Sequence, residues 1–198
     1  MEAYNLLIKR LSKSLSTLGF SKKGNSFYTH DCNNVAIINI QKSKSSTNSE
    51  IIFTINYGVC STLLMKYLWG STTKPAITVC QWVTRIQQTN YQPEWWVINE
   101  TVDVVMLEQT ILDEIKTHAI PTFHNIIGDE SLINAWLNGN SRGITLFERY
   151  RYLALLMTRY NVPGIEDALE KFIKEQGDTH RSRSLLADIK DELKSAKL

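Results

Sequence analysis

The stretch that decides the fold is residues 34–59, NVAIINIQKSKSSTNSEIIFTINYGV. Two runs rich in Ile, Val and Phe flank SKSSTNS, a polar segment without a large apolar side chain. A loop this short cannot carry the crossover that parallel strands need, so the pattern predicts an antiparallel pair. Polar residues nevertheless interrupt both runs, at Asn39, Gln41, Thr54 and Asn56.

The alternation of side chains along a strand decides which face these polar residues share. Asn39 lies either on the face of Phe53 or on the face of Thr54 and Asn56. The first arrangement buries amides among apolar side chains, at about 1–3 kcal/mol for each group without a partner. A shift of one residue separates the two registers, and burial selects the second. The apolar face is then predicted to hold Ile38, Ile40, Phe53, Ile55 and Tyr57.

Three further segments are predicted to extend the sheet. Residues 26–30 (SFYTH) follow turn residues and predict the first strand. Residues 77–86 (ITVCQWVTRI) predict a further strand, since side chains alternate from Val79 to Ile86, and residues 95–98 (WWVI) predict a short fifth strand. In the strand at 77–86, Cys80, Trp82 and Ile86 suit the apolar face. Gln81 and Arg85 join the polar face.

Helical periodicity marks the N-terminus and the chain after residue 100. The first segment predicts an amphipathic helix with one apolar side, for which a mitochondrial presequence is the alternative interpretation. That side holds Tyr4, Ile8, Leu11, Leu15 and Leu18. A helix beginning near residue 101 is predicted to stop near Pro121. Further helices are expected at 131–137, 145–160, 165–176 and 182–198. Residues 61–70 predict a short helix or an irregular crossover.

The fold class that follows is α+β. We predict a meander-like antiparallel sheet of four to five strands, packed on one face by helices, with a helical C-terminal third. Residues 1–127 are predicted to form the sheet domain, and residues 128–198 a helical extension packed on the same domain.

The composition indicates a globular protein in a reducing compartment. No run of about 18 uncharged apolar residues occurs, so no membrane partner is expected. Three cysteines without a Cys-x-x-Cys pair indicate free thiols and a cytoplasmic location. The net charge is +2, but residues 1–99 carry 10 Lys and Arg against 4 Asp and Glu, and the remainder carries 12 against 16.

Catalytic patterns are sparse. His30 and Cys32 lack a second pair of metal ligands, and His118 and His124 do not form a His-Glu-x-x-His motif. Cys80 is expected on the apolar face, where a thiol is usually unreactive. No phosphate-binding loop or nucleophile elbow occurs. We therefore expect neither a cofactor nor a metal, and no enzymatic activity.

The polar face has two interpretations that the sequence leaves open. It is either a solvated face with cross-strand polar pairs or a binding surface, because Asn, Gln and Arg form directional hydrogen bonds. The candidate binding residues are Asn39, Gln41, Thr54, Asn56, Gln81 and Arg85, with Lys22, Lys23 and Lys44 on loops at its edges. These lysines also permit RNA or single-stranded DNA binding by the basic N-terminal half, although RNP aromatics are absent. A small-molecule or enzymatic role for the same face is the third alternative.

The order of several short motifs resembles the bacterial family called domain of unknown function 4304 (DUF4304). These motifs are GFSKKGNSFY, NVAIINIQKSKSS, FTINYGV, CQWVTRI and EWWVI, within residues 5–125. The resemblance places twelve residues at family motif positions and implies no catalytic residue or cofactor. They are Gly19, Phe20, Lys23, Gly24, Phe27, Gln41, Ser43, Asn56, Gly58, Arg85, Ile86 and Trp96. Together these observations lead us to expect a bacterial protein that binds another protein through the polar face, as an immunity protein or a regulator would.

Overall fold

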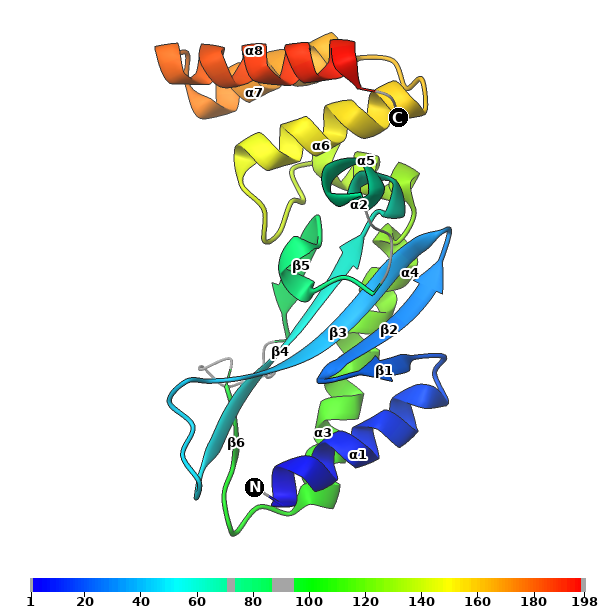
Figure 1. Cartoon of the computed structure of the whole chain (residues 1–198), viewed down its shortest axis with the longest axis vertical. Helices are drawn as coiled ribbons and strands as arrows, with labels where there is room; N and C mark the ends of the chain where they lie inside the picture. Colours follow the sequence, from blue (N-terminus) through cyan, green and yellow to red (C-terminus); the bar gives the residue numbers. More distant parts are fainter. Residues whose placement is uncertain (1, 71–73, 87–94, 197–198) are drawn as a thin grey trace.

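The computed structural model describes residues 2–70, 74–86 and 95–196. Its centre is an antiparallel sheet in the order β1-β2-β3-β4-β5, with β6 paired to the far end of β4 (Figure 1). The strands are β1 (Ser21–Lys23), β2 (Ser26–Asp31), β3 (Asn34–Lys42), β4 (Ile51–Cys60), β5 (Trp82–Arg85) and β6 (Trp96–Ile98). The α+β class and the antiparallel sheet are confirmed, with β1 as a strand that the sequence did not predict.

Helices flank this sheet and form the C-terminal part of the chain. They are α1 (Glu2–Ser16), α2 (Thr62–Trp69), the short 3-10 helix η1 (Ile77–Val79), α3 (Val104–Glu114), the π-helix η2 (Ile115–Ala119), α4 (Ile120–Ile126), α5 (Asp129–Leu137), α6 (Leu146–Arg159), α7 (Ile165–Gln176) and α8 (His180–Ser195). Within the described ranges, no helix has both the length and the apolar character that crossing a bilayer requires.

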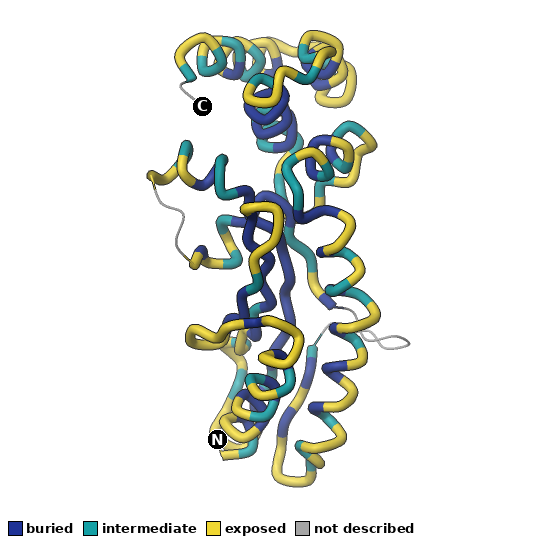
Figure 2. Tube along the Cα trace, turned by 90° about the vertical axis from the view of Figure 1, so that its right-hand side faces the viewer, coloured by how far each residue is buried: buried dark blue, intermediate teal, exposed yellow. Residues whose placement is uncertain are grey.

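Helices α1, α3 and α4 cover one face of the sheet. The ring of Tyr4 in α1 lies 6.0 Å from that of Phe53 in β4, and Phe123 in α4 lies 5.9 Å from Tyr57. Figure 2 shows the buried strands between more exposed helical segments. Helix α1 ends before Leu18, which is 40% exposed, so Leu18 does not belong to the buried side as predicted.

A smaller apolar cluster lies on the opposite face of the sheet. It contains Tyr28, Val35, Ile37, Cys60, Met65 and Cys80, with Ile77 of η1 packed against it. The prediction that Cys80 belongs to the helix-covered face is therefore wrong. The 3-10 turn at Ile77–Val79 and the bend at Gln81 interrupt the regular alternation, so only Trp82–Arg85 form a strand here.

The helix after residue 103 continues through Pro121 instead of stopping there. Asp103 caps its start, since its carboxylate accepts from the backbone N–H groups of Val105 and Met106. A π-turn at Ile115–Ala119 then leads directly into α4, with Pro121 in its first turn. Proline lacks an N–H and crowds the carbonyl four residues earlier. The wider π-turn accommodates it where a regular helix would end.

The C-terminal helices share the main hydrophobic core with the sheet. Phe53, Leu153 and Phe172 belong to one continuous cluster of buried residues. Two ion pairs connect α6 to the helices that follow it. Arg149 of α6 lies 3.0 Å from Glu175 of α7, and Arg151 of α6 lies 2.6 Å from Glu192 of α8. The domain boundary after residue 127 stays a prediction.

Candidate functional site

The strands β3 and β4 pair in the register that groups the polar residues. Asn39 lies opposite Asn56 and Gln41 lies opposite Thr54, whereas Ile40 lies opposite Ile55 on the helix-covered face. Pairing continues across the neighbouring strands, from Ser26 to Asn39 and from Asn56 to Arg85. We call the set Ser26, Asn39, Gln41, Asn56 and Arg85 the polar ladder.

Side-chain hydrogen bonds connect the members of the polar ladder. Asn39 donates from Nδ2 to the Ser26 hydroxyl at 2.8 Å. Asn56 donates to Gln41 Oε1 at 3.0 Å and accepts from Arg85 Nε at 3.3 Å. Both oxygen and nitrogen of the Asn56 amide are thus engaged, which fixes the amide orientation. Asn56 is buried, while Gln41 and Arg85 at the ends of these bonds are exposed.

An aromatic and apolar surface adjoins the exposed end of the ladder. The guanidinium carbon of Arg85 lies 5.7 Å from the ring centroid of Trp95, within cation–π range. Trp95 is half-buried, while its neighbour Trp96 packs in the core beside Phe53. Ile52 of β4 pairs with Val97 of β6, which is 42% exposed.

Two predicted site residues are buried and do not take part in the hydrogen bonds of the polar ladder. Gln81 is fully buried, where Oε1 accepts from the Ser61 N–H at 2.8 Å and Nε2 donates to the Val79 carbonyl at 3.0 Å. It anchors the start of α2 and is not available on a surface. Thr54 is also fully buried, and its hydroxyl has no hydrogen-bond partner.

The predicted lysines do not gather on one face. Lys23 pairs with Ser26 at the end of the ladder, but Lys22 pairs with Phe27 and so lies on the helix-covered side. Lys44 lies in the loop between β3 and β4. Lys42, a further residue of the basic half, lies with Nζ 4.0 Å from the Tyr4 ring centroid, also on the helix-covered side.

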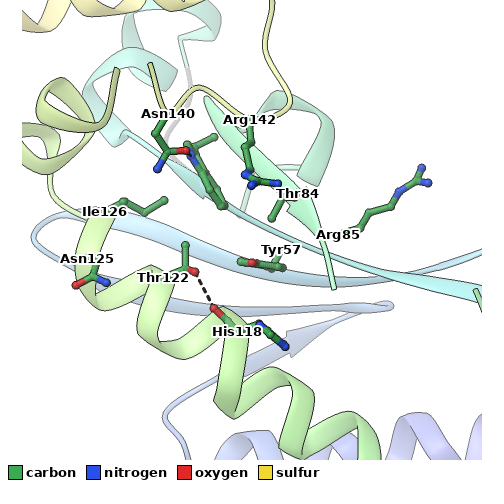
Figure 3. A pocket seen from close by; sticks show the side chains of 10 residues that line it. Tyr57, Thr84, Arg85, His118, Thr122, Asn125, Ile126, Asn140 and Arg142 are labelled. Carbon is green, nitrogen blue, oxygen red and sulfur yellow. Dashed lines mark hydrogen bonds between the residues drawn. The ribbon is translucent and has the colours of Figure 1, made fainter. Parts of the chain in front are cut away.

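A polar cleft that the sequence did not predict lies beside the outer strand β5 (Figure 3). Its volume is about 460 Å³, and three separate segments supply its walls: the sheet, the turn region of η2 and α4, and the loop between α5 and α6. The lining residues are Tyr57, Trp82, Thr84, Arg85, His118, Thr122, Asn125, Ile126, Asn140 and Arg142.

Hydrogen bonds hold the walls of the cleft in place. Trp82 donates from Nε1 to Asn140 Oδ1 at 3.1 Å, and the Val83 N–H donates to the Arg142 carbonyl at 3.0 Å. The loop between α5 and α6 therefore covers the outer edge of β5. On the opposite wall, the Thr122 hydroxyl donates to the His118 carbonyl at 2.7 Å, as the dashed line in Figure 3 marks.

Two of the thiols in the described part of the chain have raised pKa values. Burial raises the pKa of Cys80 well above its usual value, and the charge of Asp31 raises the pKa of the exposed Cys32 thiol. Raised values disfavour the thiolate that acts as nucleophile. Across residues 2–70, 74–86 and 95–196, no three His, Cys, Asp or Glu side chains converge as metal ligands would.

Comparison with known families identifies the sheet region. The family described as "Domain of unknown function (DUF4304)" matches residues 11–125, more than half of the 198 residues. The chain belongs to the DUF4304 family. Searches of curated proteins and of solved structures returned no match. The DUF4304 match includes the polar ladder and ends before Ile126, so Asn140 and Arg142 of the cleft lie outside it.

One of the twelve residues on which the resemblance rests, Gly58, has a direct structural explanation. A Cβ on Gly58 would lie 2.7 Å from the Trp82 carbonyl oxygen and 3.2 Å from Cys80 Cβ. The segment that leads into β5 crosses β4 so closely that a side chain here would displace it. Gly58 thus positions Trp82, and with it one wall of the cleft.

Proposed function

We propose that this chain is a binding protein without a catalytic role, and that it recognises another protein through the exposed part of the polar ladder. The observation that carries the proposal is the position of Arg85. It is hydrogen-bonded to the buried Asn56 on one side and stacked over Trp95 on the other. Arg and Trp are enriched among the residues that dominate binding energy at protein interfaces.

The bonding of the ladder supports recognition because it restrains the groups that a partner would meet. Gln41 is exposed, and its side-chain oxygen is held by Asn56 at 3.0 Å. Its amide nitrogen is thereby directed away from Asn56, towards solvent. Side chains that are already ordered lose less conformational entropy on binding, which leaves more of the interaction energy as affinity.

The surface next to Arg85 has the mixed character of an interface. Val97 exposes 42% of its surface, and Ile52 and Trp95 are half-buried beside it. Interfaces combine aromatic and apolar contact area with hydrogen-bonding groups at the rim. A face that only needed solvation would not require a half-buried Trp and an exposed Val.

The role that we propose for this binding protein is that of an immunity protein or a regulator in the bacterial cytoplasm. A small α+β domain that recognises its partner through side chains alone suits such a role. This part of the proposal is drawn by analogy between folds.

RNA or single-stranded DNA binding remains the alternative. It is less well supported, because Lys22 and Lys42 lie on the helix-covered side whereas Lys23 and Arg85 lie on the other. Single-strand platforms combine a continuous basic groove with stacking aromatics. A fluorescence titration with mixed oligonucleotides at low salt tests it, since binding through lysines would weaken steeply as salt is added.

The test of the protein-binding proposal compares three baits in pull-downs from cells of the source organism. They are the wild type, the double variant Gln41→Ala/Arg85→Ala, and the matched control Gln176→Ala/Arg181→Ala on α7 and α8. All four positions are exposed, so the folds should persist, as circular dichroism and thermal unfolding will verify. We expect a protein that both wild type and control retain and that the ladder variant loses. Equal retention by all three baits would contradict the proposal.

A further inference from the structure

The cleft beside β5 presents hydrogen-bond donors and no acidic side chain in its lining. The Trp82 indole is a donor only, so the oxygen of Asn140 must face it. This leaves Asn140 Nδ2 for the cleft. The Tyr57 and Thr84 hydroxyls and the Asn125 amide add further groups that can donate. Such a set of donors suits a ligand group that only accepts hydrogen bonds.

Arg142 supplies the positive charge of the cleft. Its guanidinium extends over Thr84 and Tyr57 in Figure 3, and its backbone is fixed because the carbonyl accepts from Val83. Within the described part of the chain, the Arg142 guanidinium forms no hydrogen bond or ion pair. A planar guanidinium with uncommitted N–H groups is a suitable partner for a carboxylate, which it can bind with two parallel hydrogen bonds.

The balance of charge favours a single negative charge on the ligand. Arg85 lies at the rim, but its side chain points away from the other lining residues (Figure 3). The His118 imidazole lies 3.1 Å from the Glu114 carboxylate, which offsets any charge on the imidazole. Arg142 is then the one inward-directed cation in the lining that the structure describes. It matches a carboxylate better than a doubly charged phosphate.

The size and floor of the cleft indicate what carries the carboxylate. The volume of about 460 Å³ lies in the range of small-molecule sites. The rings of Tyr57 and Trp82 lie 5.9 Å apart at an angle of 52°, next to Ile126. This apolar floor suits a short or flat body behind the charged group. We propose that the cleft binds a carboxylate, carried by a small organic acid or by an acidic side chain of a protein.

Arg85 belongs to the polar ladder and also lies at the rim of this cleft. The carboxylate proposal rests on Arg142, Asn140 and Trp82, which are not part of the ladder, and so stands independently of the protein-binding proposal. The test follows the Trp82 indole N–H signal in ¹H–¹⁵N spectra of the full chain, assigned with Trp82→Phe. Benzoate is compared with its neutral analogue benzamide, and the peptide acetyl-Gly-Glu-Gly-amide with its Gln counterpart. Inorganic phosphate is the third probe.

We expect the acids, and not their neutral analogues, to shift the Trp82 signal in a saturable way. Arg142→Gln should weaken this binding by about tenfold or more, the effect of losing a charge-assisted hydrogen bond. The matched control Arg181→Gln, an exposed Arg on α8, should leave it unchanged. A response to benzoate alone identifies a small acid as the natural source, and a response to the peptide alone identifies a protein side chain.

Three results would overturn the proposal. One is the absence of a response to either acid. Another is equal binding of acid and neutral analogue, or binding that Arg142→Gln does not affect. The last is tighter binding of phosphate than of both carboxylates.

Discussion

The backbone of Gly143 lies directly against Val83, with no room between them for a side chain. A Cβ on Gly143 would be 2.1 Å from Val83 Cγ1 and 2.5 Å from the Val83 carbonyl oxygen. Gly143 also has φ of +76°, a conformation that side chains disfavour. The loop between α5 and α6 can cover the edge of β5 only because this residue is glycine.

Gly143→Ala is therefore expected to destabilise the protein by about 2–4 kcal/mol, through backbone strain and overpacking together. Gly139→Ala is the matched control, since Gly139 has φ of +80° in the same loop but an added Cβ would meet nothing within 4 Å. The control should cost about 1 kcal/mol, from the backbone alone. Urea denaturation measures both, and equal losses would show that the contact with Val83 does not matter.

Asn34 is expected to be the amide whose removal costs the most stability. Its Nδ2 donates to the Ile127 carbonyl at 2.7 Å and to Asp129 at 2.8 Å, and its Oδ1 accepts from the Thr62 N–H at 2.9 Å. Asn34→Ala leaves these groups without their partner, and we expect a loss of about 3 kcal/mol. Asn56→Ala should cost about 1–2 kcal/mol, because its partners Gln41 and Arg85 are exposed and can bind water. The reverse order in denaturant midpoints would contradict this ranking.

Tyr4 should make the protein sensitive to alkaline pH. Burial raises the pKa of Tyr4 from 10.0 to about 12. The unfolded chain releases the Tyr4 proton at lower pH than the folded chain does. The contribution of protonated Tyr4 to the free energy of unfolding is therefore complete below pH 10 and is lost as pH rises towards 12. The Tyr4 hydroxyl is buried without a hydrogen-bond partner, so Tyr4→Phe should be neutral or slightly stabilising at pH 7. Between pH 10 and 12 the melting temperature should fall less for Tyr4→Phe than for the wild type. An equal fall in both would show that Tyr4 is not the source of the alkaline sensitivity.

The three thiols should differ sharply in reactivity. Cys60 and Cys80 are buried with their sulfur atoms 2.7 Å apart, and only Cys32 is exposed. Ellman's reagent should therefore modify one thiol per native chain, slowly because the pKa of Cys32 is raised, and all three after unfolding in guanidinium. Cys32→Ser should abolish the native reaction. Modification of a second thiol in the native state would indicate that the cluster around Cys80 opens readily.

The sheet could be predicted where polarity alternates along regular strands. Placing Asn39 with Asn56 rather than with Phe53 sufficed to set the register of β3 and β4, since the alternative buries unpaired amides. The helix at 165–176 was also predicted with its observed bounds, because the turn at residues 161–164 and Gly177 mark its ends. Both the register and the helix bounds are determined by residues that are close together in the sequence.

The position of Gln81 could not be predicted in the same way. Regular alternation placed it on the exposed polar face, but the bend before Trp82 turns its amide towards the backbone of Ser61. Only the packing of η1 and α2 against the sheet determines this orientation. A buried Gln and an exposed Gln are indistinguishable in a strand pattern.

The cleft escaped prediction because its residues come from segments far apart in the chain. Tyr57, His118 and Arg142 share no spacing that a sequence pattern could detect. One signal was nevertheless present near His118. Four apolar residues of this region, Ile111, Ile115, Ala119 and Phe123, are spaced four apart, and all four are buried. On a regular helix each such step drifts by about 40° around the axis, so the repeat indicates a wider turn.

The π-turn at Ile115–Ala119 also determines how this segment can change in length. A π-turn holds one residue more than a regular helical turn, so deleting one residue inside it would restore regular winding and leave Phe123 facing Tyr57. An added residue would instead rotate everything beyond it by about 100° relative to α3 if the winding is kept. Phe123 would then swing away from Tyr57, and Thr122 and Asn125 would leave the cleft wall. A single deletion between Glu114 and Ile120 should accordingly be tolerated better than a single insertion.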